Sequence, residues 1–292
     1  MTTSSPSITA NLRIVDLIKC GSDYLQQQGI ENPQWELEWL LCDLLSCSRM
    51  ELYVNTESEI SSERLITLDN WMQRRLAGEP LQYITGRSEF FGLPFHLNHN
   101  VLIPRPETER LVEVALNIAQ SSNVENIVDV GTGSGCIAVS LASKLSSAKI
   151  VAVDMDKPAL ELARENAALN SLAEQIEFRQ LDILSEEIDG KFDLLLSNPP
   201  YIPQNEIADL PEEIRDHEPR IALTDGNDGL TFYHRFASKG RDWVKEGGHM
   251  VMEVGRGKHP QQVEQIFTGA RYTNRKMYKD YNGDDRVITI EV

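Results

Sequence analysis

The chain has 292 residues, 41% of them hydrophobic, and a formal net charge of −17. This length allows a large core and favours two domains, and the absence of any run of 18 apolar residues predicts no membrane span. The excess of acids excludes broad binding to a nucleic-acid backbone, which requires Lys and Arg. The four cysteines are scattered and the histidines do not cluster, so we expect no metal site and a cytoplasmic protein with reduced thiols.

The first 80 residues have the apolar periodicity of helices. Asn32 followed by Pro33 is typical of a helix start, and Gly29 and Gly78 fit helix ends. We therefore expect a small all-α domain over residues 1–80. Its helices are predicted near residues 14–28, 33–45, 49–53 and 61–77.

Residues 81–106 are predicted to be a linker or hairpin, with extended pieces at 83–86 and 90–95. From residue 107 to 292, strands and helices alternate. Strands are expected at 126–130, 149–153, 175–179, 192–197, 248–254, 272–279 and 285–291, with helices such as 158–170 and 259–268 between them. The last two strands have only a short connection, so they should form a hairpin. The pattern predicts an α/β fold with a doubly wound mixed sheet, mostly parallel with the last strand antiparallel.

The most informative motif is Asn-Pro-Pro-Tyr at 198–201, directly after the apolar run at 192–197. Two prolines cannot continue a strand ladder, so the chain opens at the carboxyl end of that strand, where ligands bind in open α/β sheets. The Asn side chain both accepts and donates hydrogen bonds, and the proline carbonyls are rigid acceptors. This loop can hold a planar –NH2 group, which favours group transfer to an amide or exocyclic amine nitrogen.

A glycine-rich turn, Gly-Thr-Gly-Ser-Gly at 131–135, follows the strand at 126–130. Its glycines permit a tight turn and a close approach of a ligand to the backbone. Asp154, at the end of the next strand, can accept from the hydroxyls of a ribose. The dinucleotide fingerprint needs a glycine where this chain has Cys136, so a ligand without a pyrophosphate fits better. S-adenosylmethionine is such a ligand, and Asp129 can support its ammonium side directly or through the turn.

Taken together, these residues resemble the bacterial release-factor glutamine methyltransferases, the HemK-type enzymes. The resemblance covers nearly the whole chain and implies a Rossmann-like class I methyltransferase fold for residues 107–292, preceded by a helical substrate-docking domain. Asn-Pro-Pro-Tyr also occurs in adenine-N6 methyltransferases, so alone it indicates a chemistry and not a substrate. The segments that carry the resemblance are 83–86, 103–109, 129–135, 198–201 and 217–220.

The resemblance implies methyl transfer from S-adenosylmethionine to the side-chain nitrogen (N5) of the glutamine in the Gly-Gly-Gln loop of peptide chain release factors, which leaves S-adenosylhomocysteine. It assigns cofactor binding to Asp129, Gly131, Thr132, Gly133, Ser134, Gly135, Asp154, Asp182, Ile183 and Asn198. It assigns substrate binding to Asn198, Pro199, Pro200 and Tyr201, with Asn198, Pro199 and Tyr201 as the catalytic residues. Many relatives have an aromatic residue at the position of Ile183, so only apolar contact with the adenine is expected there.

Several alternatives stay open. The same catalytic domain can serve a ribosomal-protein glutamine; adenine-N6 methylation of nucleic acid is disfavoured by the charge of −17, and a cofactor-binding adaptor by the intact loop at 198–201. Residues 201–230 carry eight acids and two bases, which fits either a solvated loop or a surface that steers a basic protein partner. Arg105, between two prolines, either binds substrate backbone or ties the linker to the methyltransferase domain.

Overall fold

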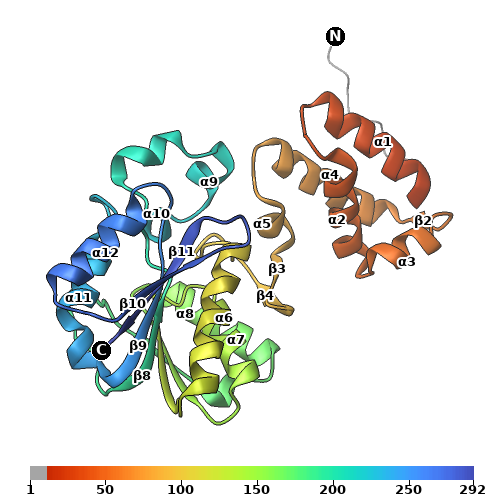
Figure 1. Ribbon diagram of the computed structural model, residues 1–292. Coiled ribbons are helices and arrows are strands. Elements are labelled where there is room, and N and C mark those ends of the chain that lie inside the picture. Colours follow the sequence, from red (N-terminus) through yellow and green to blue (C-terminus); the bar gives the residue numbers. More distant parts are fainter. Residues whose placement is uncertain (1–11) are drawn as a thin grey trace. The chain divides into compact units, whose positions relative to one another are not determined.

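The computed structural model describes residues 12–292, which divide into two compact units, one ending at Gly86 and the other running from Arg87 to Val292. The boundary falls inside the segment predicted to be a linker. Helix α5 (Leu81–Thr85) lies in the first unit, and the hairpin of β3 (Arg87–Phe90) and β4 (Leu93–His96) lies in the second (Figure 1). The prediction of an extended piece at 83–86 is therefore wrong: Ile84 packs into a helical core, and Gly86 ends the helix in a left-handed conformation.

The first unit is helical, as predicted, with one minimal strand pair added. Its further elements are β1 (Leu12–Arg13), α1 (Ile14–Gln27), α2 (Pro33–Leu45), α3 (Arg49–Val54), β2 (Glu59–Ile60) and α4 (Ser62–Leu76), and β1 pairs with β2 in antiparallel fashion. Leucines from α1, α2 and α4 meet in a core of their own. Helix α3 begins with a capping box between Ser48 and Glu51, whereas Asn32 precedes α2 without a side-chain cap.

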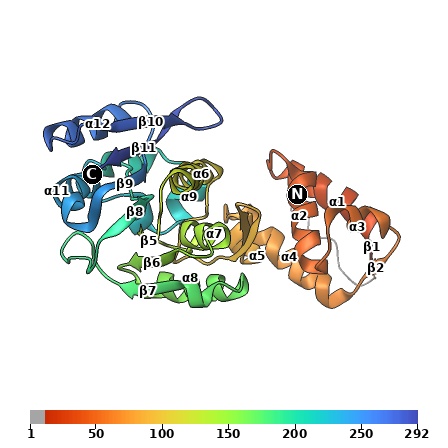
Figure 2. The same cartoon turned by 60° about the horizontal axis from the view of Figure 1, so that its bottom comes forward.

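The second unit is built on a seven-stranded sheet in the order β10-β11-β9-β8-β5-β6-β7, which Figure 2 shows from one edge to the other. Its strands are β5 (Asn126–Val130), β6 (Lys149–Asp154), β7 (Ile176–Gln180), β8 (Phe192–Ser197), β9 (Val244–Glu253), β10 (Arg275–Lys279) and β11 (Asp285–Glu291). Strands β5 to β9 pair in parallel, and β11 is antiparallel to both β9 and β10. The predicted mixed sheet with an antiparallel last strand is confirmed.

Helices cover both faces of this sheet because successive strand residues point to opposite sides. One face packs on α6 (Pro106–Ser121), α7 (Cys136–Lys144) and α8 (Lys157–Leu169), and the other on α11 (Thr231–Trp243) and α12 (His259–Gly269) (Figures 1 and 2). In β5, for example, Ile127 joins the first core and Val128 the second. The doubly wound arrangement predicted from the strand–helix alternation is confirmed.

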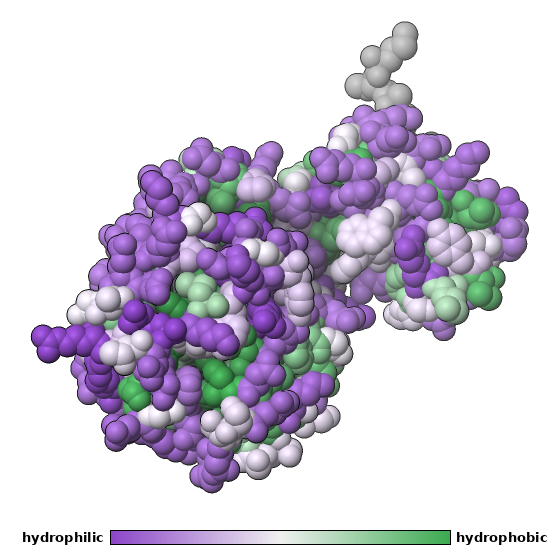
Figure 3. All heavy atoms as spheres, viewed as in Figure 1, coloured by the Kyte–Doolittle hydropathy of each residue, from purple (hydrophilic) through white to green (hydrophobic). Residues whose placement is uncertain are grey.

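A long excursion separates β8 from α11 and contains α9 (Glu212–His217) and α10 (Arg220–Leu223), with a 3-10 turn at Gln204–Asp209; a second 3-10 turn, Ala173–Gln175, precedes β7. Because β5, β6 and β8 are parallel neighbours, their carboxyl ends meet at one edge of the sheet. Hydrophilic residues dominate the surface visible in Figure 3, with smaller hydrophobic patches. Within residues 12–292, none of the helices has the length and apolar character needed to cross a membrane.

Candidate active site

The glycine-rich turn between β5 and α7 forms one wall of a pocket at the carboxyl edge of the sheet. Gly131 and Gly133 have φ values of 73° and 54°, a left-handed conformation that favours glycine. A Cβ atom at either position would meet no atom within 4 Å, so their backbone stays accessible to a ligand. Thr132 and Ser134 line the pocket with them, whereas Gly135 lies off the pocket, where a Cβ would come within 3.1 Å of Ala163 in α8.

Asp129 lies behind this turn and does not line the pocket. It is fully buried in β5, and its Oδ2 accepts a hydrogen bond of 2.6 Å from the Thr132 hydroxyl. Burial raises the pKa of Asp129 to about 7, with the nearby charge of Asp154 acting in the same direction. The sequence allowed Asp129 to support the ammonium side of a bound ligand either directly or through the glycine-rich turn. Its contact with Thr132 favours the second route.

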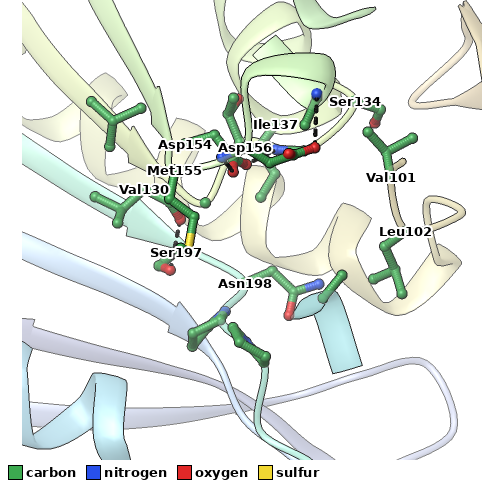
Figure 4. Close-up of a pocket in the computed structure, with 18 of the residues that line it drawn as sticks. Val101, Leu102, Val130, Ser134, Ile137, Asp154, Met155, Asp156, Ser197 and Asn198 are labelled. Atoms are coloured by element: carbon green, nitrogen blue, oxygen red, sulfur yellow. Dashed lines mark hydrogen bonds between the residues drawn. The ribbon is translucent and has the colours of Figure 1, made fainter. Parts of the chain in front are cut away.

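Asp154 lines the pocket together with Asp156 and Asp182. Its Oδ2 accepts from the backbone N–H of Gly133 at 2.8 Å, and its Oδ1 from that of Asp156 at 3.0 Å, so the glycine-rich turn and the end of β6 together fix its orientation. Burial raises the pKa of Asp154, while these two backbone donors oppose the shift. Each carboxylate oxygen can accept a further hydrogen bond, which leaves acceptors for the two hydroxyls of a ribose. Figure 4 shows Asp154 and Asn198 on different sides of this pocket.

The turn after β7 supplies an apolar part of the same pocket. Ile183 is buried there, and the Asp182 carboxylate accepts from the Leu184 N–H at 3.0 Å and the Ser185 hydroxyl at 2.8 Å. Phe232, in the first turn of α11, also lines the pocket and was missed by sequence reasoning. Its place depends on how α11 packs on the sheet, so no local motif could have revealed it.

Asn198, directly after β8, is part of a buried chain of hydrogen bonds. Its Nδ2 donates to Thr108 Oγ1 at 3.2 Å, and the Thr108 hydroxyl donates to Glu253 Oε2 at 2.7 Å. Tyr201 donates from its hydroxyl to Glu253 Oε1 at 3.1 Å. Burial raises the pKa of Glu253, while the Thr108 hydroxyl, the charge of Arg286 and the Tyr201 hydroxyl oppose the shift. This chain joins the start of α6, the end of β9 and the Asn-Pro-Pro-Tyr loop.

Tyr201 is held as a protonated hydrogen-bond donor. Its ring lies 5.7 Å from that of His259, and burial, with the negative charge of Glu253, raises its pKa far above the usual range. His259 accepts at Nδ1 from the Gly255 N–H at 3.0 Å, and its Nε2 lies 3.2 Å from the Gly229 carbonyl, so the neutral ring with a proton on Nε2 satisfies both contacts. Burial lowers the pKa of His259, which fits this neutral, structural role.

Arg105 forms an ion pair with Glu218, whose other carboxylate oxygen accepts from the Ile103 N–H at 3.4 Å. Glu218 is buried, and burial raises its pKa while the Arg105 charge opposes the shift. These contacts tie the segment before α6 to the excursion that carries α9 and α10. The ion pair fits the role of tying the chain together within the second unit, and the place of Arg105 in the lining of both pockets fits the role in substrate binding.

A second pocket adjoins the first, and Tyr201, Glu253 and His259 help to line it. Asn198 and Pro199 line both pockets, whereas Pro200 lines the first and Tyr201 the second. Leu102, Arg105 and Ala222 also line both pockets, so the two cavities meet between the Asn-Pro-Pro-Tyr loop, the segment before α6 and α10. The first cavity offers the Asp154 carboxylate, the glycine-rich turn and apolar side chains. The second also reaches Asn198, whose amide donates to Thr108.

The seven-stranded sheet with an antiparallel last strand, and a glycine-rich turn and an acid at its carboxyl edge, defines a class I methyltransferase. Residues 109–217 match the family described as "Methyltransferase small domain", and residues 16–86 match "PrmC N-terminal domain". The catalytic domain of hMettl16, solved in complex with the MAT2A 3'UTR hairpin 6, has a similar fold, with a TM-score of 0.56 and 15% sequence identity over 78% of this chain and 81% of that one.

Two relatives are similar over nearly their full lengths. Release factor glutamine methyltransferase of Geobacter sulfurreducens is 38% identical, over 98% of each chain. The protein of the same name from Bacillus subtilis is also 38% identical, over 94% of this chain and 96% of the relative. The chain therefore belongs to the release factor glutamine methyltransferase family, whose methyl donor is S-adenosylmethionine.

Proposed function

We propose that this chain transfers a methyl group from S-adenosylmethionine to the side-chain nitrogen (N5) of the glutamine in the Gly-Gly-Gln loop of a peptide chain release factor. The observation that carries the proposal is that Asn198 and Pro199 line both pockets, so a loop able to hold a planar –NH2 group borders the pocket proposed for the cofactor. Release factors act in translation, so the proposed activity belongs in the cytoplasm. The net charge of −17 suits a basic protein partner better than nucleic acid.

The residues of the first pocket fit the proposed cofactor. The acceptors of Asp154 suit the ribose, the accessible backbone at Gly131 and Gly133 suits the methionine part, and Ile183 and Phe232 provide apolar contact for the adenine. When bound, S-adenosylmethionine supplies a methyl group on a positively charged sulfur, which makes it a strong electrophile. The product, S-adenosylhomocysteine, is held by the same residues.

The protein's part in the reaction is to position an amide nitrogen, which is a poor nucleophile because its lone pair is delocalised. Asn198 Oδ1 and the Pro199 carbonyl accept from the amide hydrogens, and Tyr201 packs beside the glutamine side chain. Positioning of this kind contributes roughly 7–11 kcal/mol in favourable systems. As the nitrogen gains the methyl group, its hydrogens become more acidic, so these bonds strengthen in the transition state.

Three titratable side chains around the Asn-Pro-Pro-Tyr loop, Tyr201, His259 and Glu253, are not suited to remove the proton before transfer. The raised pKa of Tyr201 keeps its hydroxyl protonated, and both ring nitrogens of His259 are engaged by backbone groups. The pKa of Glu253 is raised, but its two oxygens already accept from Thr108 and Tyr201. We therefore assign the proton to water after the methyl group has moved.

The test is to incubate the full chain with labelled S-adenosylmethionine and, in separate reactions, a purified release factor, ribosomal protein or RNA. We expect label in the release factor, on the peptide that contains Gly-Gly-Gln when it is analysed by mass spectrometry. A release factor with this glutamine replaced by alanine is the matched control and should stay unlabelled. Label that enters the ribosomal protein or RNA in preference to the release factor would overturn the proposal.

A further inference from the structure

We propose that Thr108 and Glu253 are positioning residues that fix the rotation of the Asn198 amide, so that its Oδ1 and not its Nδ2 faces the reacting nitrogen. The inference rests on the proposed function and deepens it, because it assigns the residues that make the loop selective for an –NH2 group. Thr108 lines the first pocket and Glu253 the second, but the role assigned to them here is indirect. They act through Asn198, which lines both pockets.

The need for such a device follows from the chemistry of the Asn side chain. Its oxygen and its NH2 group are similar in size, so a half-turn of the amide exchanges an acceptor for two donors with little change in shape. A substrate –NH2 group binds only to the acceptor. In the reversed orientation, Asn198 would present hydrogens to the hydrogens of the substrate and oppose binding in the reactive geometry.

The buried chain of hydrogen bonds selects one orientation because each step has a fixed direction. Glu253 accepts at both carboxylate oxygens, Oε1 from the Tyr201 hydroxyl and Oε2 from the Thr108 hydroxyl at 2.7 Å. A hydroxyl has a single hydrogen, so Thr108 Oγ1 can then only accept. The neighbouring end of the Asn198 amide, 3.2 Å away, must be the Nδ2 donor, which leaves Oδ1 for the pocket.

Burial enforces this direction of hydrogen bonding, because water has little access to replace a missing donor or acceptor. Thr108 is 2% exposed and Glu253 is 1% exposed. The second oxygen of Glu253 is also engaged, because it accepts from the Tyr201 hydroxyl at 3.1 Å. One carboxylate at the end of β9 therefore orients both polar side chains of the Asn-Pro-Pro-Tyr loop, and reversing the Asn198 amide would put two acceptors face to face.

The decisive variants are Thr108→Val and Thr108→Ser. Valine keeps the size of the side chain but removes the hydroxyl, whereas serine keeps the hydroxyl and loses a methyl group. With the full chain and a release factor, we expect Thr108→Val to lower kcat roughly 10- to 100-fold, as misplacement of a reacting group does, with KM for the release factor and cofactor affinity little changed. Thr108→Ser should retain most of the wild-type kcat.

Two outcomes of this comparison would overturn the inference. One is a Thr108→Val enzyme that turns over at the wild-type rate. The other is a Thr108→Ser enzyme as slow as Thr108→Val, because packing of the lost methyl group would then explain the defect. Glu253→Gln is a second probe: an NH2 group replaces one carboxylate oxygen, so either Thr108 or Tyr201 loses its acceptor, and kcat should fall again.

A measurement that needs no substrate separates this inference from the proposed function. The side-chain NH2 signal of Asn198 is observed by NMR in protein labelled with nitrogen-15 at asparagine, and is assigned by its loss in Asn198→Ala. We expect slow hydrogen exchange of this group in the wild type and in Thr108→Ser, and faster exchange in Thr108→Val. Equal exchange rates in the wild type, Thr108→Ser and Thr108→Val would contradict the positioning role even if the release factor is methylated. A wild type that does not methylate release factors but shows the expected exchange rates would contradict only the proposed function.

Discussion

Asn198 is the side chain on which the proposed chemistry depends most, because it lines both pockets and ends a chain of hydrogen bonds through Thr108 to Glu253. Asn198→Ala removes the acceptor for the substrate amide, and we expect turnover to fall about 100-fold or more, the scale of a misplaced reacting group. Single-turnover methylation of a release factor that contains Gly-Gly-Gln measures this loss. The fold and much of the cofactor affinity should persist, because Asp154 and the glycine-rich turn are intact.

Asn198→Asp is the sharper control, since it keeps the shape of the side chain. The carboxylate cannot donate to Thr108 Oγ1, and the Thr108 hydrogen is already used by Glu253. An acceptor would then face an acceptor within the pocket wall, so this variant should also be strongly impaired. Near-normal rates in either variant would show that the substrate amide is held elsewhere.

Asp154 carries the second residue-scale prediction. Asp154→Ala removes the carboxylate proposed to accept from the ribose and also frees the Gly133 N–H from its partner at 2.8 Å. Loss of a charge-assisted hydrogen bond should weaken cofactor binding by roughly 1.5–3 kcal/mol. Calorimetry with S-adenosylmethionine gives the affinity directly, and an unchanged affinity would rule out the ribose assignment.

Asp129 makes the stability of the protein depend on pH in an unusual direction. Its pKa is raised from 3.8 to about 7, so between these values the native state binds a proton that the unfolded chain releases. The contribution of Asp129 to the free energy of unfolding therefore decreases as pH rises across this window. Asp129→Asn removes the titration, so the stability of the variant relative to wild type should rise with pH in the same window, as measured by urea denaturation. Two profiles that run parallel would contradict the raised pKa.

The residues that sequence reasoning could find are those fixed by local backbone chemistry. Gly131 and Gly133 have a positive φ, which favours glycine. Two prolines after a strand end its hydrogen-bond ladder. Both motifs can therefore be located from the sequence alone. Thr108 looks like an ordinary residue at a helix start, and Phe232 like one more apolar residue. Their roles arise only when α6 and α11 pack against the sheet, through contacts between segments far apart in the sequence.

At the scale of elements, the excursion between β8 and α11 shapes the Asn-Pro-Pro-Tyr loop through Gly229. A Cβ atom at Gly229 would lie 2.2 Å from the Tyr201 carbonyl oxygen, whereas one at Gly226 would meet nothing within 4 Å. Both glycines have a positive φ, 81° and 77°, so alanine strains the backbone at either site. We expect Gly229→Ala to lower methylation far more than Gly226→Ala, because only the former must displace Tyr201.

Gly226→Ala thus controls for backbone strain in this prediction, and circular dichroism of both variants controls for the fold. The measured quantity is kcat with the release factor at saturating S-adenosylmethionine. Equal defects in the two variants would indicate that strain in the excursion, and not the position of Tyr201, limits turnover.

Element prediction succeeded where a segment is buried on both sides or strongly periodic. The runs at β5, β6 and β8 are apolar strands between turn residues, and the structure places them within a residue of the prediction. At 83–86, the aromatic and β-branched residues favoured an extended chain, but Tyr83 and Ile84 are buried beside the helical core of the first unit and adopt a helical turn. Tertiary packing decided this short segment, because its local preference is weak.

At the scale of the whole molecule, the two units have separate cores. Leucines of α1, α2 and α4 form the core of the first, and the second has one core on each face of its sheet. The residues that line the two pockets all lie between Asn100 and Arg286, within the second unit. The sites proposed for the cofactor and for methyl transfer therefore belong to the second unit. For the first unit we propose a different task, docking of the protein substrate.

A chain that begins at Arg87 tests whether the second unit binds the cofactor and the first unit docks the protein substrate. It retains the sheet, both of its cores and every residue that lines the pockets, so we expect it to fold and to bind S-adenosylmethionine with an affinity close to that of the full chain. It should methylate intact release factor poorly, with the defect in KM, because docking is lost while the reacting groups are unchanged. A short Gly-Gly-Gln peptide, which is too small to reach a separate docking surface, should be methylated equally by both proteins. Calorimetry and steady-state kinetics with the two substrates measure these differences. The truncated enzyme is also compared on release factor and ribosomal protein: if it prefers release factor as strongly as the full chain does, the second unit alone selects the substrate.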